Sequence, residues 1–71
     1  MSNYIVQITS VPDRDNLVAE IWLNDVQLAE ISMENGELKL ELFCEKSKLF
    51  QLEDFITALI TARDELLSSG S

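Results

Sequence analysis

The hydrophobic period of this 71-residue chain changes once, and that change predicts its secondary structure. Between residues 3 and 44, apolar side chains recur at about every second position, as in strands that bury one face. Over residues 51–67 they follow the i, i+3, i+4, i+7 spacing of an amphipathic helix. We therefore expect an α+β protein in which the strands come first and one helix comes last.

Three clusters of turn-forming residues divide the first part of the chain into four strands. They lie at residues 11–16, at Asn24-Asp25 and at Asn35-Gly36. The last of them is the strongest hairpin signal, because both residues tolerate the positive φ of a type I′ turn. The predicted fold is a four-stranded antiparallel meander sheet with the C-terminal helix packed on one face, in the order ββββα. The predicted strands cover residues 3–10, 17–23, 27–34 and 37–44.

A two-residue loop at Asn35-Gly36 fixes the register of the last two strands. It places Ile31 opposite Leu40 on one face, with further apolar pairs on either side. On the other face it places Glu30 opposite Glu41. The apolar face is therefore the one that the helix should cover.

The preceding hairpin allows two loop lengths. A two-residue loop at Asn24-Asp25 would place Glu20 beside Ala29 on the core face, where an unpaired charge is costly. A three-residue loop that includes Val26 keeps the core face apolar, although a β-branched residue suits the left-handed position of such loops poorly. We predict the three-residue loop because the whole apolar pattern agrees with it.

The core should form between this sheet face and one stripe of the helix. In the first strand Tyr4, Val6 and Ile8 are expected to point inward. We expect a single domain over residues 1–67, followed by a flexible polar tail at 68–71. The expected contacts join Phe55, Leu59 and Leu66 of the helix to Ile21, Ile31 and Leu40 of the sheet.

The opposite sheet face has no predicted element left to cover it. In the chosen register it carries glutamates from three strands side by side, with large apolar side chains next to them. Like charges opposite each other are unfavourable in a sheet, and exposed apolar patches often mark interaction sites. We predict a partner-binding face, with a small satellite core or pairing with a second copy as the alternatives. Its residues are Glu20, Trp22, Leu28, Glu30, Glu41 and Phe43.

The charge balance narrows the class of partner. The chain has 13 Asp and Glu against 5 Lys and Arg, a formal net charge of −8. This charge favours a basic protein partner through long-range attraction, with solubility alone as the alternative interpretation. It argues against nucleic-acid binding, which needs Lys and Arg along the backbone. The acidic polar face of the helix argues equally against an anionic lipid surface.

The sequence contains no recognisable catalytic or metal-binding motif, so we expect a protein without enzymatic activity or cofactor. The chain has no His and one Cys, which excludes a metal site built on those residues. Glu30 and Glu41 form a close carboxylate pair, but nothing on an open sheet face excludes water from them, so we do not expect acid–base catalysis there. Asp13 and Asp15 begin a calcium-loop pattern, but the glycine and closing glutamate of that motif are missing.

Cys44 has no histidine to activate it as a nucleophile. We expect it on the core side at the end of the fourth strand, as a small buried hydrophobe. A lone cysteine cannot close an internal disulfide, and the expected compartment is therefore the cytoplasm.

Residues 18–43 and the helical stretch 52–66 are similar to small uncharacterised bacterial proteins that join a short meander to a C-terminal helix. Some of these look like immunity proteins of toxin systems. The resemblance implies an inhibitor that docks on a toxin or nuclease. The alternative is a homo-oligomeric structural or accessory protein that buries the same face or a strand edge against another copy.

Overall fold

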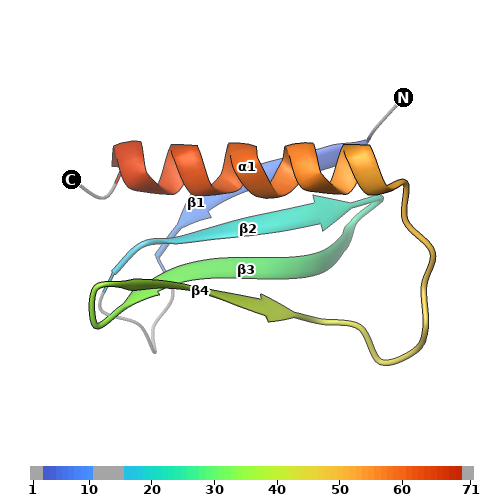
Figure 1. Cartoon of the computed structure of the whole chain (residues 1–71), viewed down its shortest axis with the longest axis horizontal. Helices are drawn as coiled ribbons and strands as arrows, with labels where there is room; N and C mark the ends of the chain where they lie inside the picture. The colour runs from blue at the N-terminus through green and yellow to red at the C-terminus, as the bar shows by residue number, and fades with distance from the viewer. Residues whose placement is uncertain (1–2, 11–15, 70–71) are drawn as a thin grey trace.

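The computed structural model describes residues 3–10 and 16–69, and it confirms the predicted ββββα order. Four antiparallel strands form one sheet in the order β1-β2-β3-β4, and one helix crosses a single face of it (Figure 1). The first predicted turn falls mostly at residues 11–15, which lie outside the described residues. The elements are β1 (Tyr4–Thr9), β2 (Val18–Leu23), β3 (Val26–Glu34), β4 (Glu37–Leu42) and α1 (Leu52–Ser69).

Gln51 caps the start of α1, although glutamine is not among the preferred capping residues. Its carbonyl accepts the first helical hydrogen bond from the Phe55 N–H at 3.0 Å, and its Oε1 accepts one from the Glu53 N–H at 3.2 Å. The helix ends at Ser69, two residues beyond its predicted end at residue 67, so Ser68 and Ser69 belong to α1. Residues 70 and 71 lie outside the described part of the chain.

The loop between β2 and β3 has two residues, so the predicted three-residue loop was wrong. Asn24 and Asp25 have φ values of 51° and 67°, and Leu23 pairs with Val26 across them. Asparagine and aspartate tolerate this left-handed conformation far better than a β-branched valine does. The turn chemistry therefore determined the loop length.

A β-bulge in β3 restores the register that the hydrophobic pattern requires. Trp22 lies opposite Gln27, but Ile21 lies opposite Ala29, which leaves Leu28 as the additional residue of β3. Beyond the bulge Ile21 and Ala29 share the core face, as they would with a three-residue loop. The extra residue thus exists as predicted, and it lies inside the strand instead of in the loop.

The hairpin at Asn35-Gly36 follows the prediction. Both turn residues have positive φ, 54° and 80°. Ile31 pairs with Leu40, and Glu30 pairs with Glu41.

The core lies between α1 and the first three strands. Small side chains at the contact let the helix approach the sheet closely: Ala58 and Ala62 of α1 are buried, as are Ala19 and Ala29 of the sheet. Ile21 is fully buried among them. The partly buried hydrophobic residues that pack around this centre are Tyr4, Val6, Ile8, Leu17, Leu23, Phe50, Phe55 and Leu59.

The helix does not cover β4, which corrects one predicted contact. α1 lies over β1 and β2, reaches β3 at its margin and does not pack on β4. Leu40, expected beneath the helix, is 48% exposed. A helix is about 10 Å wide and strands are about 4.8 Å apart, so one helix spans only two or three of the four strands.

Replacing Ile21 with alanine should destabilise the protein by about 2–5 kcal/mol, because it leaves a cavity in a fully buried position. Urea denaturation followed by circular dichroism measures this loss. Ile5→Ala is the matched control, since Ile5 is 59% exposed and its truncation should change stability by about 0.5 kcal/mol or less. Equal losses for the two variants would contradict the described core.

The phenol of Tyr4 packs against Phe55, with ring centroids 6.0 Å apart. Burial raises the pKa of Tyr4 above its ordinary value of 10.0, and the negative charge of Asp54 adds to the increase. The unfolded chain therefore ionises this residue at a lower pH than the folded protein does. The contribution of Tyr4 to stability is complete below about pH 10 and is lost as the pH rises through the folded pKa.

Because Tyr4 is the only tyrosine, the absorbance of tyrosinate at alkaline pH follows this one group. We expect its midpoint above that of the urea-unfolded chain. Asp54→Asn should lower the folded midpoint, since it removes one of the two causes. Identical midpoints for the folded and unfolded chains would show that Tyr4 is not buried as described.

Candidate functional site

The sheet face turned away from α1, here called the outer face, carries the predicted row of glutamates. Glu20 lies opposite Glu30, and Glu30 lies opposite Glu41, on three neighbouring strands. Gln7 of β1 extends the row to the fourth strand. The register that places these side chains together is therefore confirmed.

The three glutamates differ in exposure. Glu41 is exposed, Glu20 is half-buried, and Glu30 is buried with only 9% of its surface accessible. Glu20 is also held in place, because the indole Nε1–H of Trp22 donates a hydrogen bond to its Oε1 at 3.1 Å. The expectation that all three carboxylates are displayed to a partner was therefore wrong for Glu30.

The apolar residues of the outer face also differ from the prediction. Leu28, the bulge residue, is 2% exposed and belongs to the core cluster beneath the helix, so it is not displayed to a partner. Trp22 is half-buried and Phe43 is 39% exposed. The Phe43 N–H donates to the Leu28 carbonyl at 2.8 Å, which continues the β3–β4 ladder past Leu42.

Ile5 is an outer-face residue that sequence reasoning missed. It lies opposite Trp22 and is 59% exposed. The alternation in β1 placed Ile5 away from the core. The sequence did not determine the register between β1 and β2, so its neighbour across the strands was unknown. We call the accessible set the acid–aromatic patch, defined by Ile5, Glu20, Trp22, Glu41 and Phe43.

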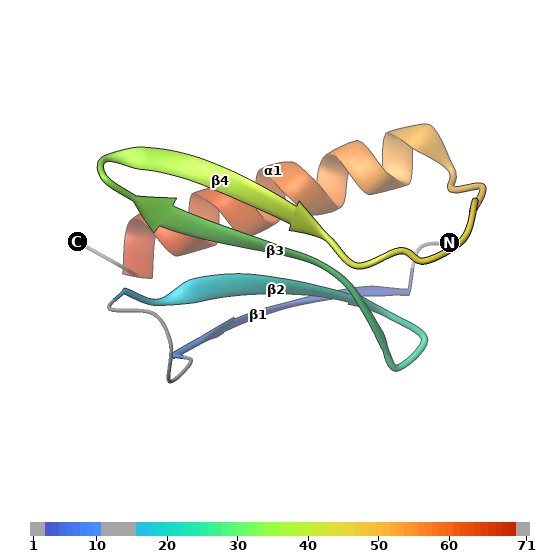
Figure 2. The same cartoon turned by 90° about the horizontal axis from the view of Figure 1, so that it is seen from below.

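A second apolar surface lies on the helix side, where β4 forms one margin of the sheet (Figure 2). Leu38, Leu40 and Leu42 are 39%, 48% and 57% exposed there. Ile60 of α1, which lines the same hollow, is 46% exposed. A hollow of about 230 Å³ lies between the two elements, and we call it the α1–β4 groove. Its lining residues are Ile31, Leu38, Lys39, Leu40, Leu59, Ile60 and Arg63.

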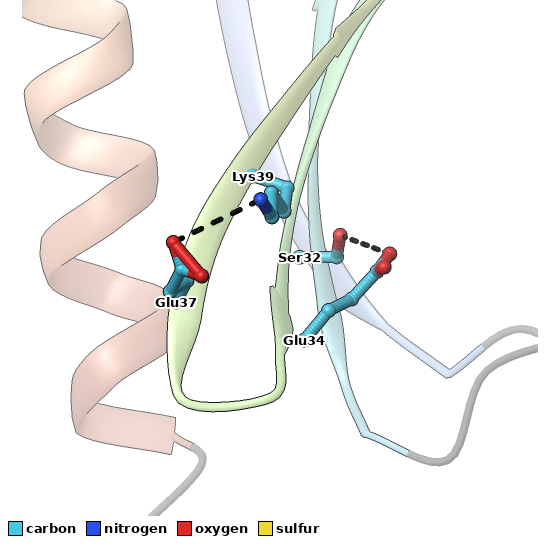
Figure 3. A network of polar contacts seen from close by, with 4 residues as sticks. All are labelled: Ser32, Glu34, Glu37 and Lys39. Carbon is cyan, nitrogen blue, oxygen red and sulfur yellow. Dashed lines mark hydrogen bonds and ion pairs between the residues drawn. The ribbon is translucent and has the colours of Figure 1, made fainter.

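Two polar contacts join side chains of the β3–β4 hairpin, which borders the groove (Figure 3). Lys39 Nζ lies 3.9 Å from Glu37 Oε2 on the same strand, and both side chains are largely exposed. On β3 the Ser32 hydroxyl donates to Glu34 Oε2 at 3.2 Å. An exposed ion pair of this kind contributes little to stability, so Lys39 can exchange partners at little cost.

Residues 3–10 and 16–69 contain no cluster of three or more ligating side chains that could hold a metal ion. The calcium-loop candidates Asp13 and Asp15 fall outside those ranges. Within the same part of the chain, no helix has both the length and the apolar character needed to cross a membrane.

Cys44 is exposed, so its prediction as a buried core residue was wrong. The physical reason is that β4 ends at Leu42, so Cys44 lies two residues beyond the strand that was expected to hold it on the core side. The residues from 43 to 49 are exposed as well.

Comparison with known proteins adds no relative to this description. No protein-family model, no curated protein and no solved structure matches the chain. The resemblance to immunity proteins therefore stays a prediction.

We expect Cys44 to react with a thiol reagent in the native protein, because its side chain is exposed. The chain has no other cysteine, so labelling is complete at one equivalent. Its rate in buffer should be close to the rate in urea, as measured by the absorbance of the released thiolate. Protection that disappears only on unfolding would contradict the described end of β4.

Proposed function

We propose that this chain is a non-enzymatic acidic binding protein that docks the acid–aromatic patch on a basic protein. An inhibitor or immunity-type protein that acts on a toxin or nuclease fits this role. The observation that carries the proposal is the hydrogen bond from Trp22 to Glu20, which fixes a large aromatic side chain beside a carboxylate on an accessible sheet face.

Trp22 has the properties of an anchor residue. Tryptophan is enriched at the energetic centres of protein interfaces, where it fills a pocket on the partner. Its bond to Glu20 restrains the indole before binding, which reduces the entropy lost when the complex forms. Exposed Ile5, directly across the strand pair, widens the apolar contact area.

The charge of the chain supports a basic partner. A net charge of −8 attracts a cationic surface over a distance of about 10 Å at 0.1 M salt. Such attraction mainly accelerates association, and salt weakens it. The carboxylate of Glu20 lies beside the anchor Trp22, and Glu41 lies two strands away on the same sheet face, where a basic rim on the partner would meet it.

Affinity capture from low-salt lysate tests this proposal. We expect the wild type to retain a basic protein in stoichiometric amount, and Trp22→Ala to weaken its binding by more than about 1 kcal/mol. Glu20→Gln should slow association at low salt, with a smaller effect at high salt.

Glu53→Gln is the matched control, because it removes the same charge from an exposed position on α1, across the sheet from the patch. It should leave capture nearly unchanged. If Glu53→Gln and Glu20→Gln reduce association equally, net charge alone attracts the protein and the patch is not the docking site.

A further inference from the structure

The free edge of β4 combines exposed apolar side chains with outward-facing backbone groups. In an antiparallel ladder, residues whose backbone groups face one neighbour alternate with residues whose groups face away from it. The Phe43 N–H donates to the Leu28 carbonyl of β3, so the backbone N–H and C=O groups of Glu41 and Lys39 also point toward β3. The N–H and C=O groups of the leucines between them therefore point away from the sheet.

An edge of this kind is a template for a further strand. The three leucines of β4 are 39% to 57% exposed on the helix side, next to the α1–β4 groove. A strand added here would gain both backbone hydrogen bonds and apolar contacts.

We propose that a second copy of this chain pairs with β4 in antiparallel orientation about a two-fold axis at Leu40. In this register Leu38 of one copy lies opposite Leu42 of the other, and the two copies of Leu40 lie opposite each other. The same register places Lys39 opposite Glu41, and the pair occurs twice by symmetry. β4 is thus complementary to itself in both apolar character and charge.

Neighbouring registers lack this complementarity. Centring the axis on Lys39 places that lysine opposite itself and Glu37 opposite Glu41, so that every charged pair is repulsive. Centring it on Glu41 places that glutamate opposite itself. A shift by one residue sets a leucine opposite a charged side chain and turns the two helices to opposite faces.

The axis at Leu40 is perpendicular to the sheet and keeps both helices on one side of an eight-stranded sheet. The leucine rows of the two copies then lie side by side between the helices. The outer faces remain on the other side of the sheet. Glu41 belongs both to the acid–aromatic patch and to the dimer contact, whereas Glu20 and Trp22 lie on β2, away from the paired edge. Lys39 makes an exposed contact with Glu37, which can be exchanged for Glu41 of the second copy.

Sedimentation equilibrium of the full chain tests the dimer. We expect a concentration-dependent dimer, and Lys39→Glu should raise its dissociation constant at least about tenfold, because both symmetric pairs become repulsive. Lys39→Glu combined with Glu41→Lys should restore dimerisation, since it exchanges the two charges. Lys48→Glu makes the same charge change in the exposed segment after β4 and should have little effect.

A cross-linking experiment tests the register independently of charge. In a Cys44→Ser background, Leu40→Cys should form an intermolecular disulfide, because directly opposite residues have Cα atoms about 5.5 Å apart. Leu38→Cys should not form one, because its two copies lie about 13 Å apart in this register.

The outcomes are separable. A wild type that stays monomeric at about 1 mM overturns the proposal, and so does a dimer that resists Lys39→Glu and cross-links at Leu38 or not at all. Circular dichroism of each variant establishes that a lost dimer is not a lost fold. Failure here leaves the proposal for the outer face untouched, because Trp22 and Glu20 take no part in the β4 pairing.

Discussion

One helix is too narrow to cover a four-stranded sheet, and the surface of this protein is a consequence of that limit. Adjacent strands are about 4.8 Å apart and a helix is about 10 Å wide, so α1 must leave part of the apolar face uncovered. The alanines at the contact bring it close to β1 and β2, where Ile21 is fully buried. Leu38, Leu40 and Leu42 of β4 remain accessible as a result. Ile56 and Ile60 of α1 are partly exposed for the same reason.

The strand register shows how two sequence signals were satisfied together. The residues Asn24-Asp25 favour a two-residue turn, whereas the apolar pattern requires one more residue between the paired strands. Sequence reasoning treats these as alternatives and chooses the pattern. The bulge at Leu28 satisfies both, because it moves the additional residue out of the turn and into β3. Bulges depend on the local twist of a particular sheet, and this one contains no glycine that would have indicated it in the sequence.

The candidate site was predictable where it depended on alternation and not where it depended on burial. Pairing rules placed Glu20, Glu30 and Glu41 in one row, and the structure has that row. Burial of Leu28 and Glu30 could not be read from the same rules, since strand pairing alone does not tell how closely other side chains cover a residue. The α1–β4 groove was missed because the prediction took every inward-facing leucine to be covered. Helix position across a sheet is set by side-chain size at the contact, and hydrophobic periodicity does not encode it.

The order of packing has a consequence for how the chain folds. Every strand pairs with its neighbour in sequence, so the meander forms from contacts of short sequence separation. The helix instead docks on β1 and β2, the most distant strands from it in the chain, and bypasses β4. Docking α1 on β1 and β2 closes the longest loop of the fold, which costs the most entropy, so we expect it to follow hairpin formation. During synthesis the sheet would emerge from the ribosome before its cover, with the core face held open until α1 is complete.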